Sequence, residues 1–448
     1  MKKETFEKIY AAVEEEAVKA GASDWELYYS GDGSLSAETF RDELSGFSAG
    51  QDGWMILRLK IGRKTGCANS TSATLSEAKK LVALAAENAA LCEKEEEVFF
   101  AEGGQTYKEL PPCTFRMPSA KAVKDAAMEM RRAAYASSDL ISDGTSGGAY
   151  ASLGETFYYS SRGLRLSDRS GSCGAYVYSV LEKDGDKRDA FKVVDGAFKK
   201  IDADAAAKEA SEKAYARFGA TVPPGGNYPI VFEGKQMQQI LGTFLPVFFA
   251  KEAQQGTSLL AGKEGEKIGA ENLTVVDDPF YEGNPMQASF DGEGSPTFTK
   301  TVIDRGVLKT LLYNLETAAK AGKTTTGNAS RGGSSIGTKV YNFYIVPGAF
   351  SREELFKKAE GGIFVTGMKG FHAGANTVSG DFSIESEGFF IKDGKQGEAI
   401  KSFTVSGNFF DLLKNIAAIG DTIEDQNPGV SKVRCPDVFL ESMPVAGA

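Results

Sequence analysis

His372 is the only histidine in this sequence of 448 residues. Zinc hydrolases bind their metal through neutral imidazoles or thiolates, commonly two histidines one helical turn apart, and keep one position open for water. The chain therefore cannot build a site that needs two histidines. His372 itself lies in GMKGFHAGAN, a glycine-rich turn after an expected strand, where an exposed turn residue is the commoner interpretation than a group in a functional cleft.

The cysteines offer no substitute for the missing imidazoles. They lie far apart, are odd in number and form no Cys-x-x-Cys pair: Cys67, Cys92, Cys113, Cys173 and Cys435. This usage is typical of reduced thiols in a reducing compartment. Glutamates interrupt the first helix where a signal peptide needs an apolar run, and the longest apolar segment is far shorter than the roughly 20 residues of a membrane-spanning helix. We expect a cytoplasmic protein without a membrane segment.

Two other segments match chemical motifs only in form. The sequence GTSGG at 144–148 fits G-x-S-x-G, but strand and turn signals follow it and a triad would need His372 from far along the chain, so we interpret it as a flexible loop. Gly322-Lys323-Thr324 resembles the end of a phosphate-binding loop, yet Thr317 stands where its first glycine belongs. We expect Gly322 to end a helix instead.

The charge balance argues against a nucleic-acid partner. The formal net charge is -10, and no long run of lysine and arginine is present. A duplex would meet a field of its own sign. We expect no direct binding of nucleic acid.

The first half shows one order of elements twice. The first copy has a helix at 3–21, strands at 25–29 and 54–61 before a turn at Gly62, and a helix capped by Thr74 or Ser76 that runs to about residue 94. The second copy has strands at 156–161 and 174–182, a turn at 184–186 and a helix at 204–218. The recurrence indicates a structural duplication.

The second half consists mainly of short, glycine-punctuated strand patterns. Turns are expected at 303–306 and 392–395, and Ser351 with Glu354 forms a capping box for a short helix. The proline- and glycine-rich stretch 221–229 is the best boundary. The fold class is therefore α+β, with an N-terminal α/β domain at 1–222 and a C-terminal domain at 223–448 built on a large antiparallel curved sheet or partial β-barrel.

Several segments together resemble the TldD/PmbA family, which is associated with modulation of DNA gyrase, and specifically its PmbA/TldE-type subunits. They are GTSLLAGKEGEKIGAENLTVVDDP at 256–279, TTTGNASRG at 324–332, NTVSGDFSIESEGFFIKDGK at 376–395 and SGNFFDLLKNIAAIGD at 406–421. The N-terminal segment GWMILRLKIGRKTGCANS fits as well. The resemblance covers nearly the whole chain.

The resemblance implies that this chain lacks the family's metal site. In the catalytic TldD branch a His-Glu-x-x-x-His motif precedes the equivalent of Gly256, and the corresponding segment here is LGTFLP at 241–246. Leu241 and Pro246 take the places of the two histidine ligands, and Gly242 takes the place of the glutamate that acts as general base. Cys435 lies in a terminus of the PmbA/TldE type, so the role of zinc ligand does not pass to it. We expect no catalytic residue and no metal in this chain, with zinc only in a TldD-type partner.

The resemblance further implies a heterodimer with a TldD-type paralogue, in which this chain helps to enclose an extended peptide substrate. An isolated chain could also form a homodimer. An independent homodimeric peptide-binding or regulatory protein is the alternative, and an enzyme with a non-metal mechanism is a weaker one, because no nucleophile and base stand together.

The expected substrate-binding residues lie in two glycine-rich segments, 256–269 and 370–381. Glycine lets a backbone approach a peptide closely, and the polar side chains between the glycines could contact it. The candidates are Ser258, Lys263, His372, Asn376, Ser379 and Asp381.

Overall fold

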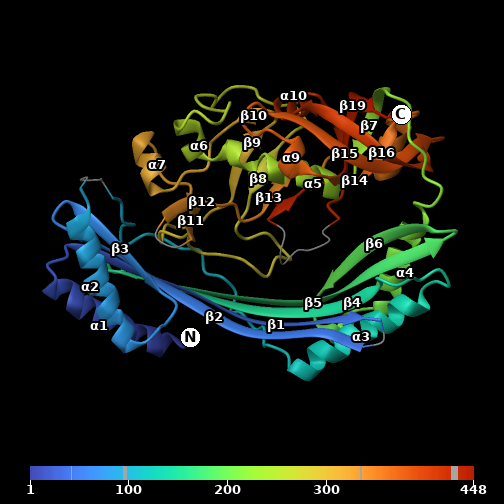
Figure 1. The fold of residues 1–448 in the computed structure, drawn as a ribbon. Coiled ribbons are helices and arrows are strands. Elements are labelled where there is room, and N and C mark those ends of the chain that lie inside the picture. The colour runs from blue at the N-terminus through green and yellow to red at the C-terminus, as the bar shows by residue number, and fades with distance from the viewer. Residues whose placement is uncertain (42, 94–97, 333–334, 425–431, 448) are drawn as a thin grey trace.

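The computed structural model describes residues 1–41, 43–93, 98–332, 335–424 and 432–447. A long twisted sheet carries the helices of the first half on one side and the β-rich second half of the chain on the other (Figure 1). Among the described helices, none combines the length and apolarity that a bilayer crossing requires.

The first half contains one order of elements twice: a helix, three strands and a helix. The elements are α1 (Lys3–Lys19), β1 (Asp24–Phe40), β2 (Glu43–Ile61), β3 (Lys64–Ser70), α2 (Leu75–Leu91), α3 (Ala120–Ala136), β4 (Ser146–Ser160), β5 (Arg165–Lys183), β6 (Asp186–Asp195), η1 (Phe198–Lys200) and α4 (Ala203–Tyr215). Strands β1 and β4 pair antiparallel at the centre, which gives the order β3-β2-β1-β4-β5-β6. The recurrence in the sequence corresponds to the two halves of one sheet, although α3 was not predicted.

Local signals explain several element ends. The Thr74 side chain accepts a hydrogen bond from the Glu77 backbone N–H at 3.3 Å and caps α2. Asp184 and Gly185 both have positive φ, at 52° and 81°, so they form the two-residue turn that matches the twist of β5 and β6. The pairs Arg305-Gly306 and Asp393-Gly394 repeat this conformation in the second half.

The expectation of a flexible loop at 144–148 is wrong for its last three residues. Ser146, Gly147 and Gly148 begin β4, and Ser146 pairs with Tyr178 of β5. A Cβ on Gly147 would lie 2.5 Å from the backbone nitrogen of Arg131 in α3. Glycine is needed there because the helix lies directly on the strand, and a G-x-S-x-G match on such a strand is not a nucleophile elbow.

The second half has the following elements: β7 (Gly226–Phe232), α5 (Gly234–Thr243), η2 (Leu245–Phe248), α6 (Ala250–Gln254), β8 (Val275–Asp277), β9 (Lys300–Asp304), β10 (Val307–Leu308), α7 (Leu315–Lys320), β11 (Ala329–Gly332), β12 (Ser335–Thr338), β13 (Phe343–Ile345), α8 (Arg352–Lys358), β14 (Ile363–Lys369), α9 (Phe371–Gly374), β15 (Asp381–Lys392), β16 (Lys395–Asn408), α10 (Phe409–Lys414), β17 (Ile416–Ile419), β18 (Val433–Arg434) and β19 (Val438–Ala446). The capping box of Ser351 and Glu354 is present at α8, and Gly322 follows α7 with φ 63°.

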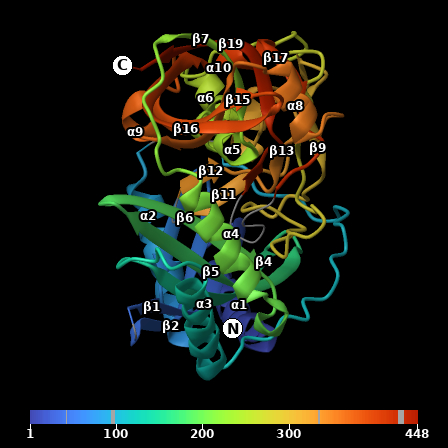
Figure 2. The same cartoon turned by 90° about the vertical axis from the view of Figure 1, so that its right-hand side faces the viewer.

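Five strands of the second half close into a barrel. The sheet order is β16-β15-β14-β7-β19-β17, and an additional pairing of β16 with β19 completes the ring. Most pairings are antiparallel, while β7 and β14 run parallel. The largest apolar cluster of the protein includes residues of these strands and of α5. The α+β class with a curved C-terminal sheet is therefore confirmed, and Figure 2 shows this half stacked on the N-terminal sheet.

Alternation along β1 decides which side chains face which layer. Leu27 and Tyr29 pack in one apolar cluster with residues of α1 and α2, whereas Tyr28 packs with Phe290 of the second half. Glu26 lies on the same side as Tyr28, because successive side chains of a strand point to opposite faces. A carboxylate is thus directed into the contact between the two halves.

Glu26 is fully buried and is bound by groups from both halves of the chain. Arg331 of β11 and the Tyr158 hydroxyl of β4 donate hydrogen bonds to its carboxylate, and Arg58 Nε lies 2.9 Å from Glu26 Oε1. Burial alone would raise the pKa of Glu26, but the guanidinium groups of Arg331 and Arg58 outweigh it and hold that pKa below its usual value. The carboxylate stays ionised inside the junction.

The loop at 288–297 completes this junction. The Ser289 backbone N–H and hydroxyl donate to the Asp168 carboxylate of β5 at 2.7 and 2.8 Å, and the Tyr107 hydroxyl donates to the Gly294 carbonyl at 2.7 Å. Gly294 has φ 79°, and a Cβ there would lie 2.4 Å from the Tyr158 ring. Only glycine lets this loop lie flat on the N-terminal sheet.

Replacing Arg331 with methionine should strongly destabilise the protein. The change leaves Glu26 buried without its main partner from the second half, and breaking a buried ion pair costs about 3–5 kcal/mol. We expect a clear fall in the urea midpoint. The control is Lys320→Met, which removes an exposed pair with Glu316 and should change the midpoint little. Equal midpoints for Arg331→Met and the wild type would show that the junction does not depend on this pair.

Glu293 should make stability depend on pH. Burial, followed by the neighbouring charge of Asp291, raises the pKa of Glu293 to about 7 from 4.5. Because the folded state holds this proton more tightly, the free energy of unfolding should fall as pH rises from about 4.5 to 7, by on the order of 3 kcal/mol. Glu293→Gln should therefore be more stable than the wild type at pH 8 and similar at pH 4, by urea denaturation. Glu316→Gln, a change at an exposed carboxylate of α7, should leave the pH profile unchanged; a Glu293→Gln profile identical to that of the wild type would refute this account.

Candidate functional site

A cavity of about 480 Å³ lies between the N-terminal sheet and the second half. The sheet contributes residues from β1, β4 and β5, and the opposite wall comes from 284–291 and 339–341, with Lys432 beside them. The junction at Glu26 and the bonds of Ser289 to Asp168 hold these two walls together. The cavity is therefore a product of the contact between the halves.

Two polar groups on the C-terminal wall have no hydrogen-bond partner. The Tyr341 residue is 7% exposed, and its hydroxyl is unpaired in the part of the chain that the structure describes. The Lys339 ammonium lies 4.9 Å from the centroid of the Tyr341 ring. It forms no hydrogen bond or ion pair with a described residue. Burial lowers the pKa of Lys339 and raises that of Tyr341. A buried unpaired donor is costly unless a ligand or water satisfies it.

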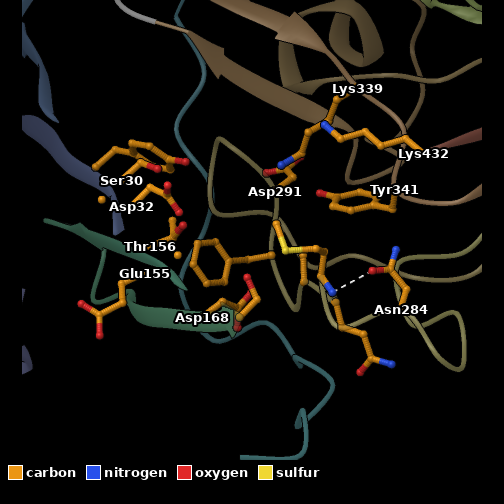
Figure 3. Close-up of a pocket in the computed structure, with 18 of the residues that line it drawn as sticks. Ser30, Asp32, Glu155, Thr156, Asp168, Asn284, Asp291, Lys339, Tyr341 and Lys432 are labelled. Carbon is orange, nitrogen blue, oxygen red and sulfur yellow. Dashed lines mark hydrogen bonds between the residues drawn. The ribbon is translucent and has the colours of Figure 1, made fainter. Parts of the chain in front are cut away.

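Charges of both signs line this cavity, and Asp291 lies on the same wall as Lys339. Figure 3 shows Lys339 and Lys432 on one side and Asp32, Glu155 and Asp168 on the other. The arrangement suits a small molecule that carries both charges, since such pockets commonly fix a ligand through a few placed polar groups.

Four of the predicted substrate residues lie together around α9 and the start of β15. The Asn376 side chain accepts from the backbone N–H groups of Val378 and Ser379, and the Ser379 hydroxyl donates to Asp381 at 2.8 Å. Hydrogen bonds from Asn408 and then Ser379 lower the pKa of Asp381. An open groove of about 580 Å³ runs beside Asn376 and Asp381. His372 is exposed on α9.

The other two predicted residues lie in a separate segment. The Ser258 hydroxyl is buried and donates to the Val247 carbonyl at 2.6 Å, so it fixes the loop that follows α6. Lys263 is exposed and pairs with Glu266 at 2.9 Å. A substrate role for all six residues stays a prediction.

The segment 241–246 is part of the apolar core. Leu241 and Phe244 are fully buried, and the Phe244 ring stacks on Phe409 with centroids 4.6 Å apart. Gly242 offers no side-chain donor, and Pro246 lies in the short helix η2. Zinc prefers nitrogen, sulfur and carboxylate ligands, so these side chains do not fit the metal.

Cys435 does not remedy this deficit. The residue is 3% exposed, and burial raises the pKa of its thiol well above the usual value, whereas a zinc ligand must be a thiolate. Among the described residues, no group of three or more His, Cys, Asp or Glu side chains is arranged to hold a metal ion.

The fold and the family models that the chain matches define a metallopeptidase-related α+β protein. The chain matches the PmbA/TldA metallopeptidase central domain over residues 114–218 and the C-terminal domain of the same proteins over 225–447. The chain belongs to the PmbA/TldD family.

Curated relatives are similar over part of the chain. A metalloprotease of Methanothermobacter thermautotrophicus is 34% identical over 223 residues, which are 48% of this chain and 47% of that protein. Metalloprotease PmbA of Escherichia coli O157:H7 is 26% identical over 49% of this chain and 46% of that protein. The matched region thus spans about half the length of these relatives.

Solved structures match the whole fold. A Thermotoga maritima protein described as a candidate modulator of a DNA gyrase has a TM-score of 0.89 and 25% identity, covering 98% of this chain and 100% of that chain. TldE of Thermococcus kodakarensis has a TM-score of 0.88 and 23% identity, covering 97% of this chain and 100% of that chain. At such identity the second match supports the fold alone.

Sequence reasoning missed the cavity and the buried cluster at Glu26. Arg331 lies within the quoted motif TTTGNASRG, but nothing in the spacing links it to a glutamate 305 residues away. Lys339 and Tyr341 alternate as strand residues do, which was the one local signal that both face the same side.

Purified protein should contain far less than one zinc per chain. The segment 241–246 supplies no lone pair suited to the metal, and the Cys435 thiol is buried in its protonated form. Elemental analysis after chelator-free purification measures the metal content directly. Stoichiometric zinc, located at this segment by anomalous scattering, would contradict the assignment.

Proposed function

We propose that this chain is the non-catalytic subunit of a TldD/TldE-type zinc metallopeptidase complex, where it shapes the channel for extended or unfolded peptides. Its partner is a TldD-type paralogue that carries the zinc and the His-Glu-x-x-x-His motif. In this proposal the complex is a cytoplasmic heterodimer, the isolated chain forms homodimers at most, and neither nucleic acid nor a membrane is bound.

The apolar core at 241–246 carries this proposal. A catalytic zinc site needs three protein ligands and a water, while here leucine, glycine and proline occupy the motif, and Phe244 between them stacks on Phe409. Family membership with a replaced motif favours a supporting subunit over an independent enzyme. The match to TldE agrees with this at the level of the fold.

We further propose that the groove at Asn376 and Asp381 is the part of the channel wall that this chain contributes. The turn is held by Asn408, whose side chain donates to the Ser379 carbonyl and to Asp381 at 2.9 Å each. Such a turn is rigid enough to position a peptide at little entropic cost. The proposed domain boundary near residue 222 places this groove wholly within the C-terminal domain.

Mixing the chain with a TldD-type paralogue from the same source should stimulate cleavage of unfolded peptides, while the isolated chain should cleave none. Enclosure aligns a substrate for attack even when only one subunit holds the metal. A fluorogenic peptide assay and size-exclusion chromatography of the mixture measure both points. Metal-independent cleavage by the isolated chain, or a mixture with neither complex nor stimulation, would contradict the proposal and leave the independent homodimeric binder.

Substitutions in the groove should weaken the stimulated cleavage. Asn376→Ala and Asp381→Ala each remove polar contacts, so the expected loss is about threefold to tenfold in kcat/KM. Circular dichroism should show a retained fold, and chromatography a retained complex. Lys395→Ala, in the hairpin at the opposite end of β15 and β16, is the matched control. Wild-type cleavage of several peptides by folded groove variants would mean that this turn is only structural.

A further inference from the structure

We propose that the cavity between the two halves binds a short peptide of two or three residues, holding its free C-terminal carboxylate at Lys339 and Tyr341 and its N-terminal ammonium at Asp32. The choice of a peptide as ligand rests on the proposed function. The site itself lies within this chain and needs no partner subunit.

The carboxylate end follows from the unpaired groups on the C-terminal wall. The Tyr341 hydroxyl and the Lys339 ammonium are donors without a described partner, and both residues line the cavity. Lys432 adds a second ammonium on the same side (Figure 3). A carboxylate can accept hydrogen bonds from a phenol and an ammonium at once, and its negative charge would pair with the Lys339 ammonium.

The carboxylates nearest to Lys339 are already hydrogen-bonded elsewhere. Asp291 accepts from the backbone N–H groups of Glu293, Ser295 and Ala329 at 2.9–3.0 Å. The Asp277 carboxylate accepts hydrogen bonds from Lys300, Asn328 and the Tyr341 backbone N–H. The Asp168 carboxylate accepts from Ser289. None of these three lies within ion-pair distance of the Lys339 ammonium. Their negative charges repel an anion bound at Lys339 only from beyond ion-pair distance.

The ammonium end follows from the acidic sheet wall. Asp32 and Asp52 are register partners on β1 and β2, and burial together with the charge of Asp52 raises the pKa of Asp32. The Asp32 carboxylate has no hydrogen-bond partner among the described residues. Glu155 is different, because the N-terminal ammonium of Met1 and Arg169 already pair with it. A ligand cation beside Asp32 would relieve the like-charge contact.

Size and lining agree with a peptide. The volume of about 480 Å³ falls in the range of roughly 300–1,000 Å³ typical of small-molecule pockets. Between the charged ends the wall combines apolar side chains, Met286 and Phe290, with the amides of Asn284 and Gln287. The Asn284 amide is bound to Asn342 and to the Met286 N–H, and the Gln287 NH2 group donates to the Phe280 and Tyr281 carbonyls. The Gln287 amide oxygen is the group that can accept from a peptide N–H, while the apolar side chains contact small side chains of the peptide.

Isothermal titration calorimetry of the isolated chain with trialanine tests the site. Trialanine should bind, and trialanine amide and N-acetyl trialanine should each bind about tenfold or more weakly, because each loses one charged contact. Lys339→Met should weaken trialanine binding by about tenfold and Tyr341→Phe by about threefold to tenfold. Lys309→Met, an exposed lysine outside the cavity, should bind as the wild type does.

The comparison of acid with amide uses the wild-type protein, so a variant that fails to fold cannot obscure the result. Three outcomes would each refute the proposed site. They are equal affinity for the acid and the amide, no heat of binding at millimolar trialanine, and full competition by acetate at equal concentration. Trialanine binding without stimulation of a TldD-type partner would leave the site intact and refute the proposed function. Stimulation of the partner without trialanine binding would refute the site and leave the proposed function intact.

Discussion

The buried carboxylate of Glu26 is the constraint on which the arrangement of the two halves depends. An ionised group without water must be satisfied by the protein, and the structure does this with Arg58 and Tyr158 of the N-terminal half and Arg331 of the second half. These partners meet only when β11 lies on the N-terminal sheet in one register. Apolar contacts alone, such as Tyr28 with Phe290, tolerate sliding, whereas a buried ion pair does not. The walls of the cavity are therefore fixed relative to one another by charge.

Much of the fold could be predicted because its signals are local. The helices at 3–19 and 75–91, the turns at 184–185 and 393–394, and the capping box at Ser351 each depend on a few adjacent residues. Helix α3 was missed although Ser119 caps it and Val123, Ala127 and Met130 bury one face at helical spacing. The closure of β16 on β19 joins segments about forty residues apart, which no local pattern specifies.

The features of the candidate site also divide into those that the local sequence predicts and those that only the packing of the chain creates. The chain has a single histidine, so the lack of a two-histidine centre was decided by residue types before any geometry was known. The turn around Asn376 was found because asparagine, glycine and aspartate have strong turn preferences. The cavity is different: Asp32 comes from β1, Asp168 from β5, and Lys339 and Tyr341 from the segment between β12 and β13. Only the packing of the two halves brings them to one space.

The segment 241–246, which the family resemblance aligns with the metal motif of TldD-type proteins, is held by apolar packing. Leu241 and Phe244 have become members of the largest apolar cluster, and Phe244 stacks on Phe409 at the start of α10. Restoring one imidazole at Leu241 would remove part of this packing and would bury a polar ring without partners, two costs of about 2–5 and 1–3 kcal/mol. A second ligand at Pro246 would have to appear as well before zinc could compensate for either cost. The apolar packing of 241–246 thus opposes the introduction of a metal site at this segment by single substitutions.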